Sequence, residues 1–381
     1  HFYNSFDVES GSDGFYYVAF SELEFFAAYN VFIQKFSASG IPQFSNPIGV
    51  IQDFSADENV RAIYDIDGQG LIIIYDSESF LTGRKVKAVA VDYNGNILSG
   101  WEDGINISDY DSDQTFQGAV NTGDSIFVIW NDDRGDGDDI YGQLINLDDG
   151  PSDLSSGFPI AAYESYQQNP TIAYNDIKSE VIVCWQDYVQ NSYYDISCRT
   201  INSSLEQSDV FKVADISFAN QINPYVYTTT TGDYLIVWQD SRNYTGSVAP
   251  NDDIYLQQLS GDTFVFGLNG LSVCDAVFSQ TYPQVELYDE DSNSYVIFWN
   301  DLRSSGKADL VNIYAQSITL SSCAVGDLNN DGISNVIDVV SLVNIILDSS
   351  GSTVPCSADI NNDGIANVID IVSLVNIILS N

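Results

Sequence analysis

The stretch Tyr234-Leu-Ile-Val-Trp-Gln-Asp240, followed by Asp253-Ile-Tyr-Leu-Gln257, decides the fold because variants of it recur along most of the chain. An apolar run that ends in Trp-x-Asp is typical of a buried β-strand, and the alternating Ile-x-x-Gln segment is typical of a second strand. A polar break rich in Gly, Asn and Asp separates the two runs. Each copy therefore predicts a β-hairpin with an aromatic residue near the end of its first strand.

The hairpin occurs six times. The Trp or its aromatic equivalent stands at spacings of 53 to 61 residues, at Phe20, Tyr75, Trp130, Trp185, Trp238 and Trp299. Another strand behind Gln-x-x-Pro precedes several copies, beginning at Gln167, Gln221 and Gln280. Linking segments such as 104–108 and 211–215 end in a short strand. About four strands in each of six units predict a six-bladed β-propeller.

The six units together are one such part short. Six hairpins have only five linking segments between them, and the chain runs from the last strand, at 317–322, directly into Cys323. One blade is therefore predicted to lack its outer strand. An open sheet edge of this kind favours the addition of a strand from another segment.

The last sixty residues carry a second repeat. Residues 326–347 and 358–379 differ at only four positions, and each copy opens with Asp-x-Asn-x-Asp-Gly, with another Asp eleven residues after the first. Oxygen donors at positions 1, 3, 5, 7 and 12 of such a loop wrap one calcium ion, position 7 through its backbone carbonyl. The loops predict two calcium ions, with the ligands Asp327, Asn329, Asp331, Ile333, Asp338 and Asp359, Asn361, Asp363, Ile365, Asp370.

A calcium loop followed by a single helix, duplicated with 32 residues between copies, closely resembles a type I dockerin. The resemblance implies a domain that folds around calcium and binds a cohesin on another protein. The hairpin repeats resemble, more loosely and over about residues 10–320, the Trp-x-Asp-x-Arg and Asp-Ile-Tyr-x-Gln repeats of secreted bacterial propeller proteins. The predicted fold is mainly β, with a six-bladed β-propeller at 1–320 and a small α-helical, dockerin-like calcium-loop domain at 321–381.

The predicted partner-binding residues depart from the dockerin pattern. Recognition positions that usually hold a small polar pair are apolar here, and later positions that often carry charge hold Asn; the full set is Val336, Ile337, Val340, Asn344, Val368, Ile369, Val372 and Asn376. Sixty residues cannot cover so much apolar surface, although a tight two-helix core would absorb part of it. The expected partner is a cohesin-like domain or another copy of this chain, which would give a homo-oligomer or filament. Only Ser321-Ser322 links the two domains, so the tail is expected to be fixed to the propeller or held in an assembly.

Composition limits the partners further. The chain has 54 Asp and Glu against 12 Lys and Arg, a formal net charge of −42, which disfavours binding to nucleic acid or anionic lipid. The sequence contains no apolar run of 18 or more residues, so no membrane span is predicted. The start at His1 and the absence of Met indicate a removed signal peptide, and hence a secreted, extracellular or cell-surface protein; the alternative is a trimmed chain.

Five Cys residues suit an oxidising compartment. Two disulfide pairs are predicted: Cys323 with Cys356, because each precedes a calcium loop, and Cys184 with Cys198, because they lie on facing arms of one hairpin. Cys274 is left over. The alternative is five separate thiols.

No catalytic residue is predicted. His1 is the only His, which argues against a Ser-His-Asp hydrolase and a His-ligated zinc site. The Asp after each Trp and the Arg that follows are interpreted as a repeated ion pair of the turn. The acidic turn 131–139 is either a further calcium site or, with more weight, a solvated loop.

Two functions are compatible with these features. The favoured one is a non-catalytic structural protein that assembles through its calcium-dependent tail, and a head-to-tail fibre is one form of such an assembly. The alternative is an extracellular polysaccharide-degrading enzyme, as a glycoside hydrolase, or a carbohydrate-binding propeller carried by its dockerin.

Overall fold

The computed structural model divides the chain into two compact units, His1–Val183 and Cys184–Asn381, and each is described by itself. The structure describes residues 3–24, 28–53, 55–66, 68–135, 137–147, 150–151, 156–189, 193–214, 216, 218–244, 251–290, 292–303, 311–320, 326, 328, 334–347, 356–361 and 365–380. No helix among these residues is long and apolar enough to cross a membrane.

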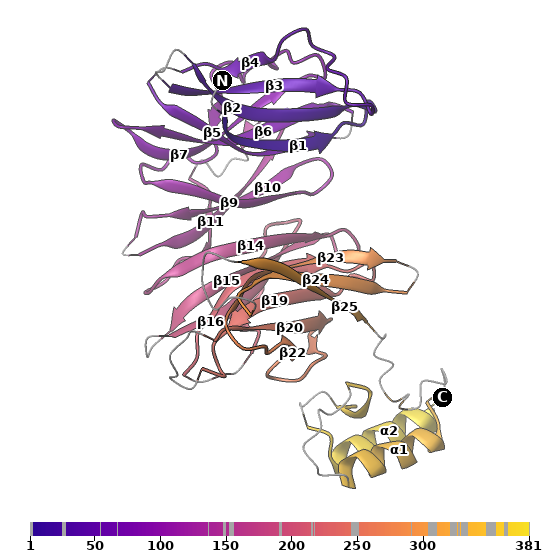
Figure 1. Ribbon diagram of the computed structural model, residues 1–381. Coiled ribbons are helices and arrows are strands. Elements are labelled where there is room, and N and C mark those ends of the chain that lie inside the picture. Colours follow the sequence, from indigo (N-terminus) through magenta and orange to yellow (C-terminus); the bar gives the residue numbers. More distant parts are fainter. Residues whose placement is uncertain are drawn as a thin grey trace. The chain divides into compact units, whose positions relative to one another are not determined.

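Three antiparallel sheets follow one another in the first unit (Figure 1). The first sheet has the order β1 (Tyr3–Ser10), β2 (Tyr16–Glu24), β3 (Ala28–Phe36) and β4 (Ile48–Ile51). The second has β5 (Asp57–Ile66), β6 (Gly70–Ser79), β7 (Gly83–Val91) and β8 (Ile105–Asn106). The third has β9 (Gln114–Asn121), β10 (Ile126–Asp132) and β11 (Asp139–Asn146), and β11 also pairs with β12 (Gly150–Pro151) and β13 (Phe158–Ala161).

Three more sheets follow. The fourth has β14 (Gln167–Asn175), β15 (Glu180–Val189), β16 (Tyr193–Asn202) and β17 (Phe211–Lys212), and the boundary between the units falls within β15. The fifth has β18 (Gln221–Thr228), β19 (Tyr234–Asp240) and β20 (Asp253–Ser260), and β20 also pairs with β21 (Thr263–Phe264) and β22 (Leu271–Cys274). The sixth has β23 (Gln280–Asp289), β24 (Ser294–Asp301) and β25 (Asn312–Thr319).

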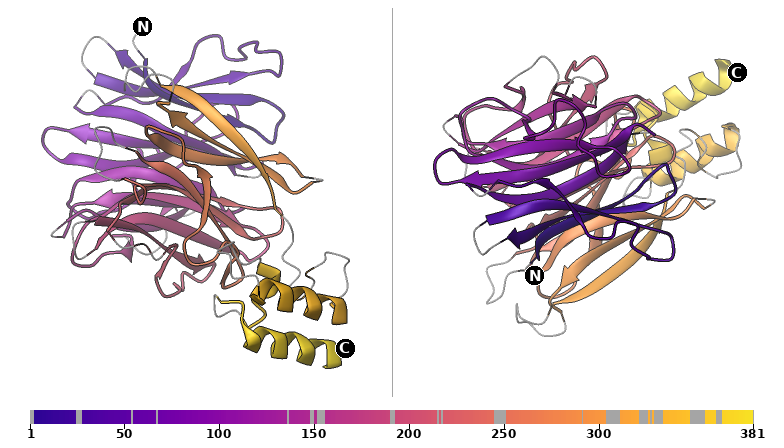
Figure 2. Two further views of the ribbon diagram at one scale, coloured as in Figure 1. Left: turned by 60° about the horizontal axis from the view of Figure 1, so that its bottom comes forward. Right: turned by 90° about the horizontal axis from the view of Figure 1, so that it is seen from above.

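The C-terminal region is helical. It contains α1 (Val336–Leu347), a short 3-10 turn η1 (Cys356–Ala358) and α2 (Val368–Ser380). The two α-helices lie side by side in both views of Figure 2. Six successive antiparallel sheets, each a meander of about four strands, are the blades expected of a β-propeller. The predicted fold class, mainly β with a small helical C-terminal domain, is confirmed.

The apolar runs of the repeats form the second strand of each sheet and are buried, as their composition predicts. Trp130, Trp185 and Trp238 are fully buried, and Tyr75 takes the same place in the second sheet. Because these strands are covered on both faces, β6 and β19 are buried along almost their whole length.

The Trp-x-Asp-x-Arg motif is a buried polar cluster. In the fifth sheet the carboxylate of Asp240 accepts hydrogen bonds from Trp238 Nε1 at 2.8 Å and Arg242 Nη2 at 2.6 Å, and the Arg242 guanidinium lies 3.7 Å from the Tyr255 ring centroid. Gln221 Nε2 donates to the same carboxylate at 3.3 Å. One motif thus joins the first, middle and third strands of the sheet.

The third and sixth sheets repeat this cluster around Asp132 and Asp301, each with a Trp Nε1 donor at 2.9 Å. Burial raises the pKa of Asp132, but hydrogen bonds from Arg134, Ser112 and Trp130 outweigh it and hold the pKa below its usual value. The geometry supports the interpretation of the repeated Asp and Arg as structural ion pairs.

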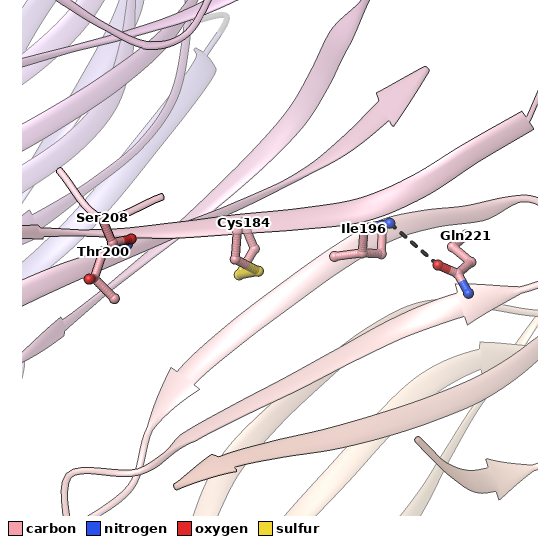
Figure 3. Close-up of a disulfide and its surroundings, with 6 residues drawn as sticks. Cys184, Ile196, Thr200, Ser208 and Gln221 are labelled. Atoms are coloured by element: carbon pink, nitrogen blue, oxygen red, sulfur yellow. Dashed lines mark hydrogen bonds between the residues drawn. A yellow bond between two sulfur atoms is a disulfide. The ribbon is translucent and has the colours of Figure 1, made fainter. Parts of the chain in front are cut away.

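In the fourth sheet Val189 replaces the Arg, and the buried Asp has a different hydrogen-bond partner. Asp187 accepts a hydrogen bond from Ser197 Oγ at 3.2 Å, and the buried Trp185 Nε1 finds no acceptor among the described residues. Here a disulfide joins Cys184 of β15 to Cys198 of β16 (Figure 3). The predicted pairing is therefore confirmed. Its counterpart cannot be followed, because Cys323 lies outside the described residues.

At the register position of the Trp-x-Asp carboxylate, the second sheet has its acid on the first strand instead of the middle strand. Glu58 of β5 stands at the register position where Gln114 and Gln221 stand in the third and fifth sheets, and it pairs with Ser77 where they pair with Asp. Ser77 Oγ donates to Glu58 Oε1 at 3.0 Å, whereas Oε2 is buried with no partner among the described residues. Burial raises the pKa of Glu58 to about 7, against a smaller opposing effect of Lys87.

We expect Glu58→Gln to stabilise the protein above pH 7. Because the folded-state pKa of Glu58 lies above the unfolded value, the folded state binds more protons, and stability falls as pH rises from about 4.5 to about 7. The substitution removes this loss, worth up to about 3 kcal/mol. Urea unfolding of both proteins from pH 4.5 to pH 8 measures the difference. A matched control is Glu78→Gln on the exposed end of β6, which should leave the pH dependence intact. Identical profiles for wild type and Glu58→Gln would contradict the expectation.

Candidate calcium-loop and assembly site

Both C-terminal helices begin with the same side-chain cap. In α1 the Asn335 Oδ1 accepts from the Ile337 backbone N–H at 2.8 Å, and the Asp338 Oδ2 accepts from the Asn335 N–H at 2.9 Å. In α2 Asn367 and Asp370 repeat these bonds, both at 2.8 Å. This reciprocal arrangement is a capping box in which Asn and Asp replace the usual Ser or Thr and Glu. The sequence Asn-x-x-Asp therefore fixes where each helix starts.

The same Asp also ties its helix to the preceding loop. Asp370 Oδ1 accepts from the backbone N–H groups of Ile360 at 2.8 Å and Asn361 at 3.1 Å, and Asp338 Oδ1 accepts from that of Leu328 at 2.8 Å. Asp338 and Asp370 are both fully buried. One carboxylate in each copy thus caps the helix and anchors the loop that carries the other predicted ligands.

A small apolar core joins the two copies. Leu342, Ala358 and Leu374 are fully buried and pack with partly buried residues from both helices, among them Val339 and Ile371. Leu342 and Leu374 occupy equivalent positions, so each helix contributes the same side chain to the shared core. The two copies therefore form one folding unit.

Gly326 explains one of the four differences between the copies. Its φ is +87°, in the left-handed region, and a Cβ built there would lie 2.7 Å from Leu374 Cδ1. Its N–H donates to the Ser357 carbonyl at 3.1 Å and so links the first copy to the start of the second. Ala358, the equivalent residue, is buried in the core instead.

The predicted ligands are only partly within the described residues. Asp338, Asp359, Asn361, Ile365 and Asp370 are described; Asp327, Asn329, Asp331, Ile333 and Asp363 lie outside. Among described residues alone no group of three or more His, Cys, Asp or Glu side chains is placed to hold a metal ion. The donor set is nevertheless all oxygen and mostly carboxylate, and the twelfth-position carboxylate is buried at the loop, which fits a hard cation such as calcium.

The predicted partner-binding residues all lie on the surface. Val336, Ile337 and Val340 of α1 are 69%, 56% and 57% exposed, and their counterparts Val368, Ile369 and Val372 of α2 are 66%, 54% and 57% exposed. Asn344 and Asn376 are exposed as well. The helix ends add Leu347 and Leu379, which the sequence reasoning did not single out. The two-helix core therefore does not absorb this apolar surface.

Comparison with known proteins gives one family for this region. Residues 325–379 match the dockerin type I domain. The match covers both calcium loops and both helices, so the predicted dockerin resemblance is confirmed for this domain. Dockerin domains bind calcium and take part in protein–protein assembly, which supports calcium as the metal and a protein as the partner. They are typical of extracellular or cell-surface proteins.

The rest of the chain is similar to solved structures at the level of fold. The BP39L lectin from Burkholderia pseudomallei has a TM-score of 0.52 at 9% identity, with 80% of this chain and 78% of the lectin covered. The α-L-arabinofuranosidase Arb93A from Fusarium graminearum has a TM-score of 0.48 at 12% identity, over 83% and 93%. A Dyadobacter fermentans protein of unknown function has a TM-score of 0.44 at 9% identity, over 84% and 95%. No curated protein sequence matches the chain.

The acidic turn of the third sheet uses most of its described carboxylates internally. Asp132 binds Arg134, Asp133 Oδ1 accepts from the Asp113 N–H at 2.8 Å, and Asp138 Oδ2 accepts from Gln168 Nε2 at 2.6 Å. These contacts give three of the carboxylates of the turn a protein partner without a further calcium ion. A calcium site at this turn stays a prediction.

Proposed function

We propose that the protein is a non-catalytic structural protein, secreted or held at the cell surface, whose calcium-loaded dockerin domain attaches it permanently to a protein partner. One observation carries the proposal: the helices of the dockerin domain present six Val and Ile side chains, each more than half exposed, and all six are residues that we predict to bind the partner. Exposed aliphatic clusters of this kind mark protein interfaces, because water contact with them is unfavourable.

The calcium loops would position this surface. Each copy would hold one ion. The ligands of the first copy would be Asp327, Asn329, Asp331, the Ile333 carbonyl and Asp338. Those of the second would be Asp359, Asn361, Asp363, the Ile365 carbonyl and Asp370. A bound ion would neutralise the carboxylates that converge on each helix start. The helices, and with them the apolar surface, would then depend on calcium.

The partner is either a cohesin-like domain or the next copy of this chain. Attachment of one copy's dockerin domain to the propeller of the next would be a head-to-tail contact, which gives a fibre when successive rotations do not close a ring. The repeated Asp and Arg residues support a non-catalytic propeller, because the three clusters are internal ion pairs that each bind a buried Trp.

The test is assembly of the purified full chain with and without EGTA, followed by negative-stain electron microscopy and analytical ultracentrifugation. We expect the wild type to form large assemblies in calcium and to lose them in EGTA. The double variant Val336→Asp with Val368→Asp, at two exposed positions outside the helical core, should form no assemblies even in calcium. The matched control, Asn344→Asp with Asn376→Asp, adds the same charge to α1 and α2 at polar exposed positions and should assemble more readily than the Val variant. A monomeric wild type in calcium, at all concentrations, would refute self-assembly. Hydrolysis of a plant or algal polysaccharide by the same preparation would favour the enzymatic alternative.

A further inference from the structure

The sixth sheet differs from the other five at one edge. In the first five sheets a short strand pairs with the third strand on its outer side: β4, β8, β13, β17 and β22. In the sixth sheet the third strand, β25, is the last strand that the described residues contain (Figure 1). After β25 the Leu320 N–H donates to the Asn293 carbonyl, so the described chain continues along the turn between β23 and β24 rather than back along β25.

The backbone groups at this edge can be assigned from the other sheets. In the second and fourth sheets the carbonyls of Val86 and Ile196 accept from the N–H groups of Ile107 at 3.0 Å and Val213 at 2.9 Å, the residues directly after the outer strands β8 and β17. The position that matches Val86 in the sixth sheet is Ile313, since both pair with the residue after the middle-strand aromatic. Ile196 has the same place in the sequence repeat, because it follows Asp195 as Ile313 follows Asn312. The Ile313 backbone therefore points outward, away from β24.

A second outward carbonyl lies four residues further along. The carbonyls of Lys35, Ala90, Thr200 and Gln258 accept, at 2.8 to 2.9 Å, from backbone N–H groups of the segment that connects the third strand to the outer strand. Ser317 occupies their position in β25. Because alternate residues of a strand direct their backbone groups to the same side, Ile313, Ala315 and Ser317 together present the open edge.

Within the described residues, β25 lacks the charge, Pro and bulge that usually protect a sheet edge. β25 contains no Lys, Arg, Asp, Glu or Pro. Its eight residues pair with β24 in one unbroken register, without a bulge. Sheet proteins normally protect an exposed edge strand with charge, Pro or a bulge, because an unprotected edge recruits other strands.

We propose that the β25 edge is a strand-addition site for an extended polypeptide segment from another chain, with aliphatic residues at alternate positions. The five outer strands define that chemistry. They place apolar residues two apart, as in Ile48 and Val50 or Phe158 and Ile160, and the second member is buried in four of the five cases (Val50, Ile107, Ile160 and Val213). The incoming segment lies antiparallel to β25, with its first aliphatic residue opposite Ala315, as Leu271 lies opposite Leu256.

This site goes beyond the proposed dockerin-mediated attachment, because it lies on a propeller sheet and needs no calcium. A protein with both has two distinct points of attachment, one through helices and one through a strand edge.

The probe is a fluorescent peptide of residues 268–276 with Cys274→Ser, which reproduces the outer strand of the fifth sheet. We expect it to bind the full chain in fluorescence anisotropy, with and without EGTA, and to protect the 311–320 segment from hydrogen exchange. A scrambled peptide with its aliphatic residues adjacent should not bind. Persistence of binding in EGTA separates this site from the dockerin domain.

Ala315→Pro removes one outward N–H that β24 does not use, and should weaken peptide binding at least about tenfold. Ala315→Val, which keeps that N–H, should retain binding. If Ala315→Pro does not fold, Ser317→Pro tests the same edge. No binding to wild type, protection elsewhere than 311–320, or equal binding by the Pro and Val variants would overturn the proposal. The wild type could instead form a dimer that Ala315→Pro abolishes, while binding no peptide. That result would show that the edge pairs with the β25 edge of a second copy and not with an extended segment, and it would overturn the proposal.

Discussion

Asp370→Ala is expected to abolish the folded, calcium-bound state of the second loop and to unfold most of the dockerin domain. The carboxylate caps α2, accepts two further backbone N–H groups from the loop and is the predicted twelfth-position ligand. Loss of the cap alone costs about 1 kcal/mol. Substitution of residues that only contact a metal ligand lowers metal affinity roughly 10–100-fold. Loss of a ligand itself should lower the calcium affinity more than that. Because calcium binding and folding are coupled, these losses appear together.

Isothermal titration of the calcium-free full chain and circular dichroism of the helical signal measure this effect. Wild type should bind two ions per chain and gain helix, whereas Asp370→Ala should lose both high-affinity binding and most of the gain. Asn376→Ala, on the exposed face of the same helix, is the control and should behave as wild type. Two ions bound to Asp370→Ala with wild-type affinity would show that the ligand assignment is wrong.

Asp240→Ala is expected to destabilise the propeller by about 3–5 kcal/mol. The fully buried carboxylate is the shared acceptor for Trp238, Arg242 and Gln221, so its removal leaves a guanidinium and an indole N–H without their acceptor in the interior. The cost comes mainly from these stranded donors rather than from the lost attraction itself.

Urea unfolding followed by tryptophan fluorescence, in the presence of calcium, measures the change in the propeller transition. The matched control is Asp233→Ala at the start of the same hairpin, where the carboxylate accepts only a Gln258 side-chain bond at 2.8 Å among the bonds described and no charge is stranded. A loss of less than about 1 kcal/mol for Asp240→Ala, a typical value for an exposed ion pair, would contradict the structural role of the motif.

Much of the fold could be predicted because the sequence repeats its own signals. Alternating apolar runs, polar breaks and the Trp-x-Asp motif recur in register, so each copy supports the interpretation of the others. The Cys184 and Cys198 pairing followed from the hairpin, which places the two residues on neighbouring strands. The helix starts also followed, because Asn and Asp three residues apart form a local cap that depends little on the rest of the chain.

Other features depend on contacts between strands that no local pattern reveals. Nothing in the segment Asp57-Glu-Asn-Val60 indicates that Glu58 is fully buried opposite Ser77; only the alignment of β5 with β9 would have shown an acid where Gln114 stands. Trp185 is another example: its buried Nε1 has no acceptor among the described residues, although Asp187 stands two residues further on, where the other sheets place the acceptor. The spacing of oxygen-bearing residues suffices to predict a set of calcium ligands, whereas no pattern within this chain predicts which partner surface contacts the apolar helices.

The position of the buried acid makes the sheets less interchangeable than their repeats suggest. In the third sheet the acid is on the middle strand and an amide faces it; in the second sheet the acid is on the first strand and a hydroxyl faces it. A recombinant blade with β5 and β10 together would bring Glu58 opposite Asp132, two carboxylates in one buried pair. The converse blade, with β9 and β6, would contain no acid there. Of the two exchanges, only the one that joins β5 to β10 buries two carboxylates together, and moving a whole hairpin with the strand before it avoids that pair.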